Sequence, residues 1–432
     1  MMKKEFWKYV IPSMVTFLAT GIYVGVDGFF VGRTVGDIGL GSINLAWPLT
    51  SLILAIGTGI GIGGAINISI HNGAGEKDKA DRTLGNTLTL LLIASIALTA
   101  MLLIFAKPLL RLMGAEGELL ELSSEYVGIL AGGAVFQVFG SGIAPLLRNQ
   151  NKAVLAMVLM VTNFVIDTAL SGVFVMALGY GVAGAAWATV VGQCIALIPA
   201  VLILFKKENR VASSGYKLDK DLVPHIIKSG ASIAGLSFIP SLTVIVINRQ
   251  ALTYGGTTAI AAFAVISYAL SIGQFLLQGV GEGSQPLISF YYGAKDSKAV
   301  KQLRKWTYMT AAVIGLIATV GLIALRNDIP RFFGVSEETL AVLRLALPLC
   351  ALSLPLYAFS RVTTEYFNAI KKSTNAAVMV YGEALVLLPA CALVLPLFLD
   401  LNGVWCSLVL VQFLLLFVGS FLRTKSREAL IN

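Results

Sequence analysis

Twelve apolar stretches follow one another along this chain, and each is long enough to cross a lipid bilayer. A membrane-spanning helix needs about 20 apolar residues. Backbone groups inside lipid must be hydrogen-bonded within the protein, and the stretches do not alternate as barrel strands do, so they predict helices. We therefore predict an all-α integral membrane protein. The approximate limits of its spans are residues 8–32, 42–70, 86–106, 125–147, 154–178, 182–205, 229–254, 258–290, 307–325, 339–369, 376–399 and 403–422.

Charged residues are scarce and biased toward base. They make up 13% of the chain, against about 25% in soluble proteins. The net charge of +9 favours basic loops facing anionic lipid over nucleic-acid binding. If the N-terminus lies in the cytoplasm, 24 basic residues fall on the inner side and 5 on the outer side. This asymmetry predicts a multi-pass protein of the inner membrane with both termini cytoplasmic. We expect a monomer in contact with membrane lipids.

The two halves of the chain repeat each other. The pair Gly73-Ala74 resembles Gly293-Ala294 at an offset of 220 residues, and Gly181 resembles Gly403 at an offset of 222. Each half contains six spans, so both share one orientation and are related by an axis along the membrane normal. We predict two pseudo-symmetric six-helix bundles, an N-lobe of residues 1–205 and a C-lobe of residues 229–432 with a short cytoplasmic tail. A cytoplasmic linker, 206–228, joins them.

Two carboxylates interrupt apolar spans of the first half. Asp27 lies in the first span and Asp167 in the fifth. A charge at the centre of a membrane helix costs roughly 2.5–3.5 kcal/mol on insertion scales and usually marks a proton or ion site. Asn163 lies four residues before Asp167, on the same helix face, and Thr189 of the next span offers a hydroxyl. The alternative is a set of interhelical hydrogen bonds, each contributing about 0.6 kcal/mol.

The second half contains its own polar residues within spans. Arg361 and Glu365 are four apart and predict an intramembrane ion pair. Glu383 either binds a cationic substrate or a coupling proton, or it pairs with Arg249 or Arg361. Glu282 and a pair of glutamines one turn apart either line a cavity or join helices. The candidate cavity residues are Gln274, Gln278, Glu282, Arg361, Glu365 and Glu383.

No catalytic or metal-binding pattern accompanies these residues. The four cysteines lie in apolar segments without metal-ligand spacing, and His71 and His225 fall in polar stretches. The run GTGIGIGG lacks the lysine of a nucleotide-binding loop and lies inside a span, where close helix packing explains it better. The sequence therefore predicts no enzyme, no catalytic residues, no cofactor and no dedicated metal site.

Four local sequence features stand out in order along the chain. They are VDGFFVGR at the end of the first span, a Gly-Ala loop followed by charges in each half, NFVID in the fifth span and GVAGAAWAT at the start of the sixth. Together they resemble the MATE family, the multidrug and toxic compound extrusion antiporters. The bacterial multidrug-efflux branch is the most similar. The resemblance implies two six-helix bundles around a central cavity, and export of amphipathic, cationic small molecules by alternating access.

The same resemblance assigns roles to individual residues. It places the coupling ion at Asp27, Asn163, Asp167 and Thr189. It also gives Pro12 the role of a helix kink that accompanies ion binding, with a static kink as the alternative. The small ligand set favours H+, and Na+ at Asp27, Asn163 and Asp167 is the other option.

Three other classes of protein remain as alternatives. A lipid-linked precursor flippase of the same broader fold group would carry more spans and more cationic residues facing the cavity. A membrane-embedded enzyme would need a nucleophile, a metal or a base constellation, and a structural or receptor-like protein would not need buried acids.

Overall fold

The computed structural model describes residues 2–113, 115–204, 213–333 and 336–431. Within its helices, side chains are described except at residues 22–29, 37, 40, 200, 201, 203, 204, 213, 214, 238, 257, 332 and 426–431. The described residues form helices joined by short turns, without any strand. The chain divides into two compact units. Unit 1 comprises Met1–Phe238 and Ser289–Lys295, and unit 2 comprises Ile239–Ile288 and Asp296–Asn432.

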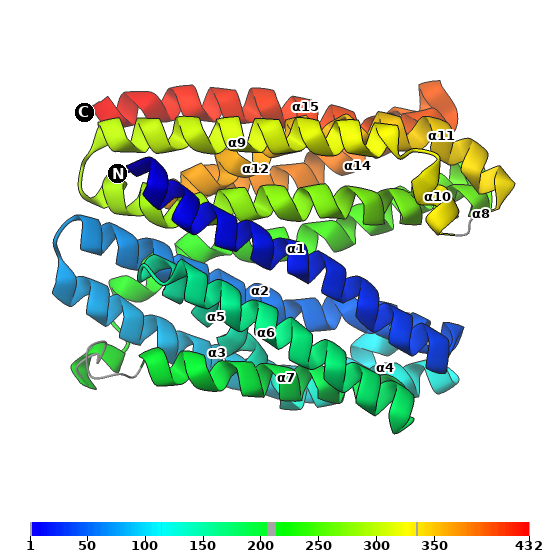
Figure 1. Ribbon diagram of the computed structural model, residues 1–432, viewed down its shortest axis with the longest axis horizontal. Coiled ribbons are helices and arrows are strands. Elements are labelled where there is room, and N and C mark those ends of the chain that lie inside the picture. Colours follow the sequence, from blue (N-terminus) through cyan, green and yellow to red (C-terminus); the bar gives the residue numbers. More distant parts are fainter. Residues whose placement is uncertain (1, 114, 205–212, 334–335, 432) are drawn as a thin grey trace. The chain divides into compact units, whose positions relative to one another are not determined.

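The described part of unit 1 contains seven α-helices, two short helices of other types and both ends of α8. Figure 1 shows α2, α3, α5, α6 and α7 running roughly along one direction. The elements are α1 (Met2–Thr34), α2 (Asp37–Gly73), α3 (Lys77–Leu112), α4 (Gly117–Gly132), α5 (Ala134–Asn149), α6 (Ala153–Ser171), the π-helix η1 (Gly172–Ala177), α7 (Gly181–Leu204) and the 3-10 helix η3 (Ser213–Tyr216).

Unit 2 contains the middle of α8 and the helices that follow. α8 (Leu222–Gly293) is two helices joined at Gly256, which has φ 64°, a conformation that glycine adopts without strain. The other elements are α9 (Ser297–Ala324), α10 (Asp328–Phe332), α11 (Glu337–Ala351), α12 (Ser353–Ala369), α13 (Ser373–Gly382), the π-helix η4 (Glu383–Leu387), α14 (Leu388–Val394) and α15 (Pro396–Ile431).

The helices are long and apolar enough to span a membrane. Ten helices among the described residues meet this criterion, and an eleventh span results if α4 and α5, bent by 61°, count as one. The predicted fourth span, 125–147, is thus broken at Gly133, between two helices. The twelfth span is the predicted first one, 8–32, which falls in α1, where the structure does not describe the side chains of residues 22–29.

The sequence repeat recurs in the backbone. Three pairs of residues with positive φ are separated by 220 positions: Gly36 and Gly256, Gly75 and Lys295, and Asn151 and Lys371. Each half also has a π-helical segment within its fifth predicted span: η1 lies within 154–178 and η4 lies within 376–399. The same turns therefore end the same helices in both halves, as a duplicated sequence requires.

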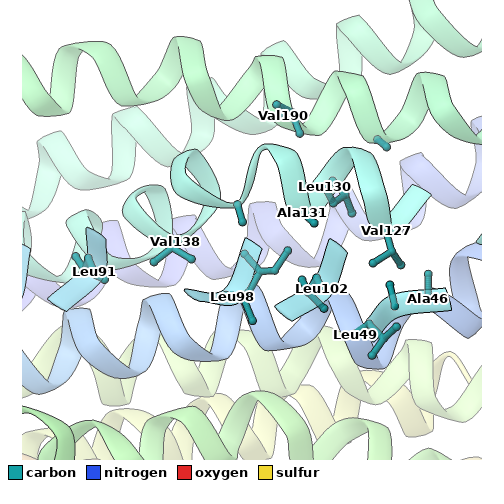
Figure 2. Packing of buried hydrophobic residues seen from close by; sticks show 14 of the residues in the cluster. Ala46, Leu49, Leu91, Leu98, Leu102, Val127, Leu130, Ala131, Val138 and Val190 are labelled. Carbon is teal, nitrogen blue, oxygen red and sulfur yellow. The ribbon is translucent and has the colours of Figure 1, made fainter. Parts of the chain in front are cut away.

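Apolar side chains and glycines hold unit 1 together. Leu98 and Leu102 of α3 lie near Val127 and Leu130 of α4, and Leu91 of α3 lies beside Val138 of α5 (Figure 2). All belong to one apolar cluster, to which α2 and α7 also contribute. Lipid supplies no hydrophobic drive between spans, so membrane helices associate through close packing of small residues.

The glycine-rich run of α2 provides such packing. A Cβ at Gly57 would lie 2.7 Å from the Val138 carbonyl oxygen, and one at Gly61 would overlap Gly142 of α5. The run GTGIGIGG is therefore a helix-packing surface, as predicted.

Some predicted boundaries move. α8 begins at Leu222, inside the stretch expected to be linker, so His225 lies in a helix and not in a loop. His71 likewise lies in the last turn of α2. Arg148 lies in the last turn of α5 and is 7% exposed. The Ser13 hydroxyl on α1 accepts a hydrogen bond from its guanidinium at 3.5 Å.

Candidate functional site

The Asp167 side chain lies on α6, in the contact with α7. It is 1% exposed. Gly192 of α7 faces it, because a Cβ at position 192 would lie 3.2 Å from the Asp167 Cβ and 3.3 Å from its Cα. The absence of a side chain at Gly192 thus lets α7 approach the carboxylate-bearing turn of α6.

Two other predicted residues share these faces. Asn163 lies one turn before Asp167 on α6, and its Oδ1 is buried without a hydrogen-bond partner among the described residues. Thr189 lies three residues before Gly192 on α7, which places it on the same side of that helix. Its hydroxyl donates to the Ala185 carbonyl at 3.2 Å. The structure therefore brings Asn163, Asp167 and Thr189 to the contact between α6 and α7.

Asp27 lies in α1, and its side chain is outside the described residues. The helix itself packs against α6. Asp27 therefore belongs to a helix that packs against the helix bearing Asp167.

Gln193 is a polar neighbour that sequence reasoning missed. It follows Gly192 and points toward α5, since a Cβ at Gly140 would lie 2.9 Å from its Oε1. That oxygen is buried and has no hydrogen-bond partner within the described ranges. A buried acceptor of this kind is suited to a donor group. A lone glutamine after an apolar run, in VVGQ, is the only signal that the sequence offers.

The N-terminal part of α1 is fixed by the turn between α5 and α6. The side-chain oxygen of Asn151 accepts hydrogen bonds from the Lys8 ammonium and the Tyr9 hydroxyl, each at 3.1 Å. α1 continues through Pro12, and the Thr16 hydroxyl donates to the Pro12 carbonyl at 2.9 Å. The helix is therefore anchored on the N-terminal side of its proline.

In unit 2, buried charges gather around Arg361 of α12. Its Nη2 lies 3.2 Å from Glu365 and 3.6 Å from Glu282 of α8. The predicted pair of Arg361 and Glu365 is confirmed. Gln278 donates to Glu282 at 2.9 Å, so α8 and α12 are joined by one polar chain. Gln274, one turn earlier, is half-buried and forms no hydrogen bond with another described side chain.

Glu383 belongs to a second polar chain. It accepts a hydrogen bond of 2.6 Å from the amide of Gln412 on α15, whose oxygen accepts one of 2.6 Å from the Ser360 hydroxyl on α12. Arg249 is exposed, so it is not the partner of Glu383. Gln412 was not predicted, because a glutamine among apolar residues has no spacing relation to a glutamate on another helix.

We call Arg361, Glu282, Glu365 and Glu383 together the C-lobe cluster. Glu282 and Glu365 are paired with the Arg361 guanidinium, whereas Glu383 is hydrogen-bonded to the Gln412 amide. Among the residues that the structure describes, no group of three or more His, Cys, Asp or Glu side chains is placed to hold a metal ion.

Long apolar helices in two repeated halves, with acids buried between spans, define a polytopic membrane transporter. The family model described as MatE matches residues 12–173 and 233–393, once in each half. The chain belongs to this family, the MATE family of multidrug efflux transporters, and is not an enzyme.

Relatives and solved structures agree with this assignment. The chain is 23% identical to the multidrug export protein MepA of Staphylococcus haemolyticus over 99% of its own length and 94% of that protein. For MepA of Staphylococcus aureus (strain MSSA476) the identity is 22%, over 95% of this chain and 90% of that protein.

Its fold matches an outward-facing multidrug resistance MATE family transporter of the MOP superfamily. The TM-score is 0.94 and the identity 25%, over 99% of this chain and 96% of that one. A MOP superfamily transporter from Pyrococcus furiosus gives the same score and identity over 100% and 97%. The expected all-α transporter fold is thereby confirmed.

Proposed function

We propose that this chain is an ion-coupled antiporter that exports amphipathic, cationic small molecules by alternating access. Support comes from the relatives, which are multidrug export proteins, and from the two acidic sites. The chain would lie in the inner membrane as a monomer with both termini in the cytoplasm. Its lobes would correspond to residues 1–205 and 229–432, joined by the linker 206–228.

The observation that carries the coupling proposal is the burial of Asp167 against Gly192. A carboxylate in that position can be neutralised by a proton or a cation, and α1, with Asp27, packs on the same helix. Binding of the ion from outside would change the charge between α1, α6 and α7. Because Asn151 anchors α1 ahead of Pro12, a bend of α1 would concentrate at or beyond the proline.

The coupling ion is H+ in this proposal. A proton needs only one carboxylate, whereas Na+ needs several oxygen ligands, for which Asp27, Asn163 and Asp167 are the candidates. Thr189, whose hydroxyl donates to the Ala185 carbonyl, is the fourth candidate residue at this site.

The C-lobe cluster is the proposed site for the cationic part of the substrate. Arg361 compensates part of the charge of Glu282 and Glu365, whereas Glu383 is bonded by the neutral amide of Gln412. Of these three carboxylates, Glu383 is therefore the one whose negative charge is compensated least. Gln274 and Gln278 would contribute hydrogen bonds.

Efflux from proteoliposomes tests the proposal. Proteoliposomes are loaded with ethidium and given a pH gradient or a sodium gradient. They contain wild-type protein, Asp167→Asn or the control Glu121→Gln, which removes an exposed carboxylate of α4. We expect wild type and the control to export ethidium under the pH gradient, and Asp167→Asn to be inactive. Efflux by Asp167→Asn at the wild-type rate would refute the N-lobe site. Absence of efflux from wild type under either gradient would favour the flippase.

A further inference from the structure

Asn86 of α3 holds residues 215–219, a part of the predicted linker, against its helix. Its side-chain amide donates to the carbonyls of Gly215 and Lys217 at 3.0 and 3.1 Å, and its oxygen accepts from the Asp219 N–H at 2.7 Å. Three hydrogen bonds from one buried side chain fix the backbone of residues 215–219 on the helix. The position of every side chain on this segment is thereby tied to α3.

A pocket of about 320 Å³ lies at this junction, which we call the α3–linker pocket. Its lining is Arg82, Asn86, Lys217, Leu218 and Asp219. The side chain of Asn86 is already used by the linker. Asp219 Oδ1 accepts the Asp221 N–H at 2.8 Å, ahead of the first turn of α8.

Besides the Asp219 carboxylate, which holds the Asp221 N–H through Oδ1, the charged groups of the lining are two cations. Arg82 and Lys217 are both exposed, and neither side chain has an ion pair or a hydrogen bond among the described residues. The Lys217 carbonyl is held by Asn86, and Arg82 lies one turn before Asn86 on the same helix. The backbones that bear the two cations are therefore fixed relative to each other, and both residues line the pocket.

The pocket lies where an apolar span meets polar chain. α3 is a candidate membrane span from Lys77 to Leu112, and Arg82 belongs to its second turn. Leu218, also in the lining, is 49% exposed. Two cations next to an exposed leucine at a span end match a phosphate group attached to an apolar body, since basic pockets at the cytoplasmic side of spans attract anionic head groups.

We propose that the α3–linker pocket binds the phosphate group of an anionic ligand through Arg82 and Lys217. Arginine suits this role because its planar guanidinium can bind phosphate oxygens in pairs, and lysine adds a point charge. The phosphate can come from an anionic phospholipid of the adjacent leaflet or from a soluble phosphate ester. In either case the bound ligand would hold the linker against α3.

Native mass spectrometry of purified full-length protein with phosphatidylglycerol, and calorimetry with inorganic phosphate, test the proposal. The variant is Arg82→Gln with Lys217→Gln, which leaves Asn86 intact. The control is Lys220→Gln, an exposed lysine of the same segment outside the lining. We expect the double variant to retain about fivefold less phosphatidylglycerol than wild type, with the control within about twofold. Equal melting temperatures would show that the variants are folded.

The two probes distinguish the sources of phosphate. Loss of phosphatidylglycerol from the double variant alone identifies the lipid. Unchanged lipid binding, together with inorganic phosphate that binds wild type and not the double variant, identifies a soluble ester. Equal binding of both probes by the double variant and the control would overturn the proposal, because it would show only diffuse attraction to a basic surface. Wild type that binds neither phosphatidylglycerol more than phosphatidylcholine nor phosphate would also overturn it.

Discussion

Gly192 of α7 lies so close to Asp167 of α6 that a Cβ at position 192 would stand 3.2 Å from the Asp167 Cβ. The neighbours in this contact are the backbone and Cβ of Asp167, which cannot rotate away. Any side chain at position 192 must therefore push the two helices apart or displace the acid.

Gly192→Val should destabilise the protein by about 1–3 kcal/mol, as overpacked cores do, and reduce ethidium efflux. Gly128→Val is the control, because nothing lies within 4 Å of a Cβ at that helical glycine. Melting temperature and efflux are measured on both. Wild-type behaviour of Gly192→Val would show that the contact between α6 and α7 tolerates a side chain.

Arg361→Met should destabilise the protein strongly, because it leaves Glu282 and Glu365 buried without their cation. Removing one partner of a buried ion pair costs about 3–5 kcal/mol. Arg344→Met removes an exposed arginine from a span and should have little effect. Denaturant unfolding compares the two variants, and equal losses would argue against a structural ion pair at Arg361.

Glu383→Gln should weaken binding of cationic substrates more than that of neutral ones, since the charge of the carboxylate is lost while its shape remains. Gln412→Leu is the companion variant. It removes the 2.6 Å hydrogen bond to Glu383 but keeps the charge, so it should preserve the preference for cations. Binding of ethidium and of a neutral dye measures this preference. Equal losses for both dyes in Glu383→Gln would make the residue purely structural.

Asn151→Gly should loosen the start of α1. The residue has φ 64°, which glycine adopts without strain, so the substitution removes the hydrogen bonds from Lys8 and Tyr9 and keeps the turn. Hydrogen exchange of the first turns of α1 should become faster, while exchange in α9 should not change. Unaltered exchange in α1 would show that packing alone holds this helix.

The sequence predicted what depends on local spacing. The twelve spans follow from hydropathy, and the face shared by Asn163 and Asp167, like the pair of Arg361 and Glu365, follows from the four-residue period of a helix. The repeat predicted from Gly73 and Gly293 reappears in turns 220 residues apart.

Contacts between distant helices could not be predicted in this way. The hydrogen bond from Gln412 to Glu383 and the approach of Gly192 to Asp167 depend on how helices pack, which periodicity within one helix does not encode. Arg148 shows the same limit, because an arginine at a span end reads as a loop residue until the hydroxyl of Ser13 on another helix is placed beside it.

The most direct test of ion coupling is the affinity of purified protein for ethidium as a function of pH and of sodium concentration, in wild type and in Asp167→Asn. If the ion and the substrate are exchanged through Asp167, each must weaken the binding of the other. The wild-type Kd should then rise as pH falls, by at most about tenfold per pH unit for one proton, or rise with sodium, and the Kd of Asp167→Asn should depend on neither. A wild-type Kd independent of both ions, or an equal dependence in Asp167→Asn, would contradict the account.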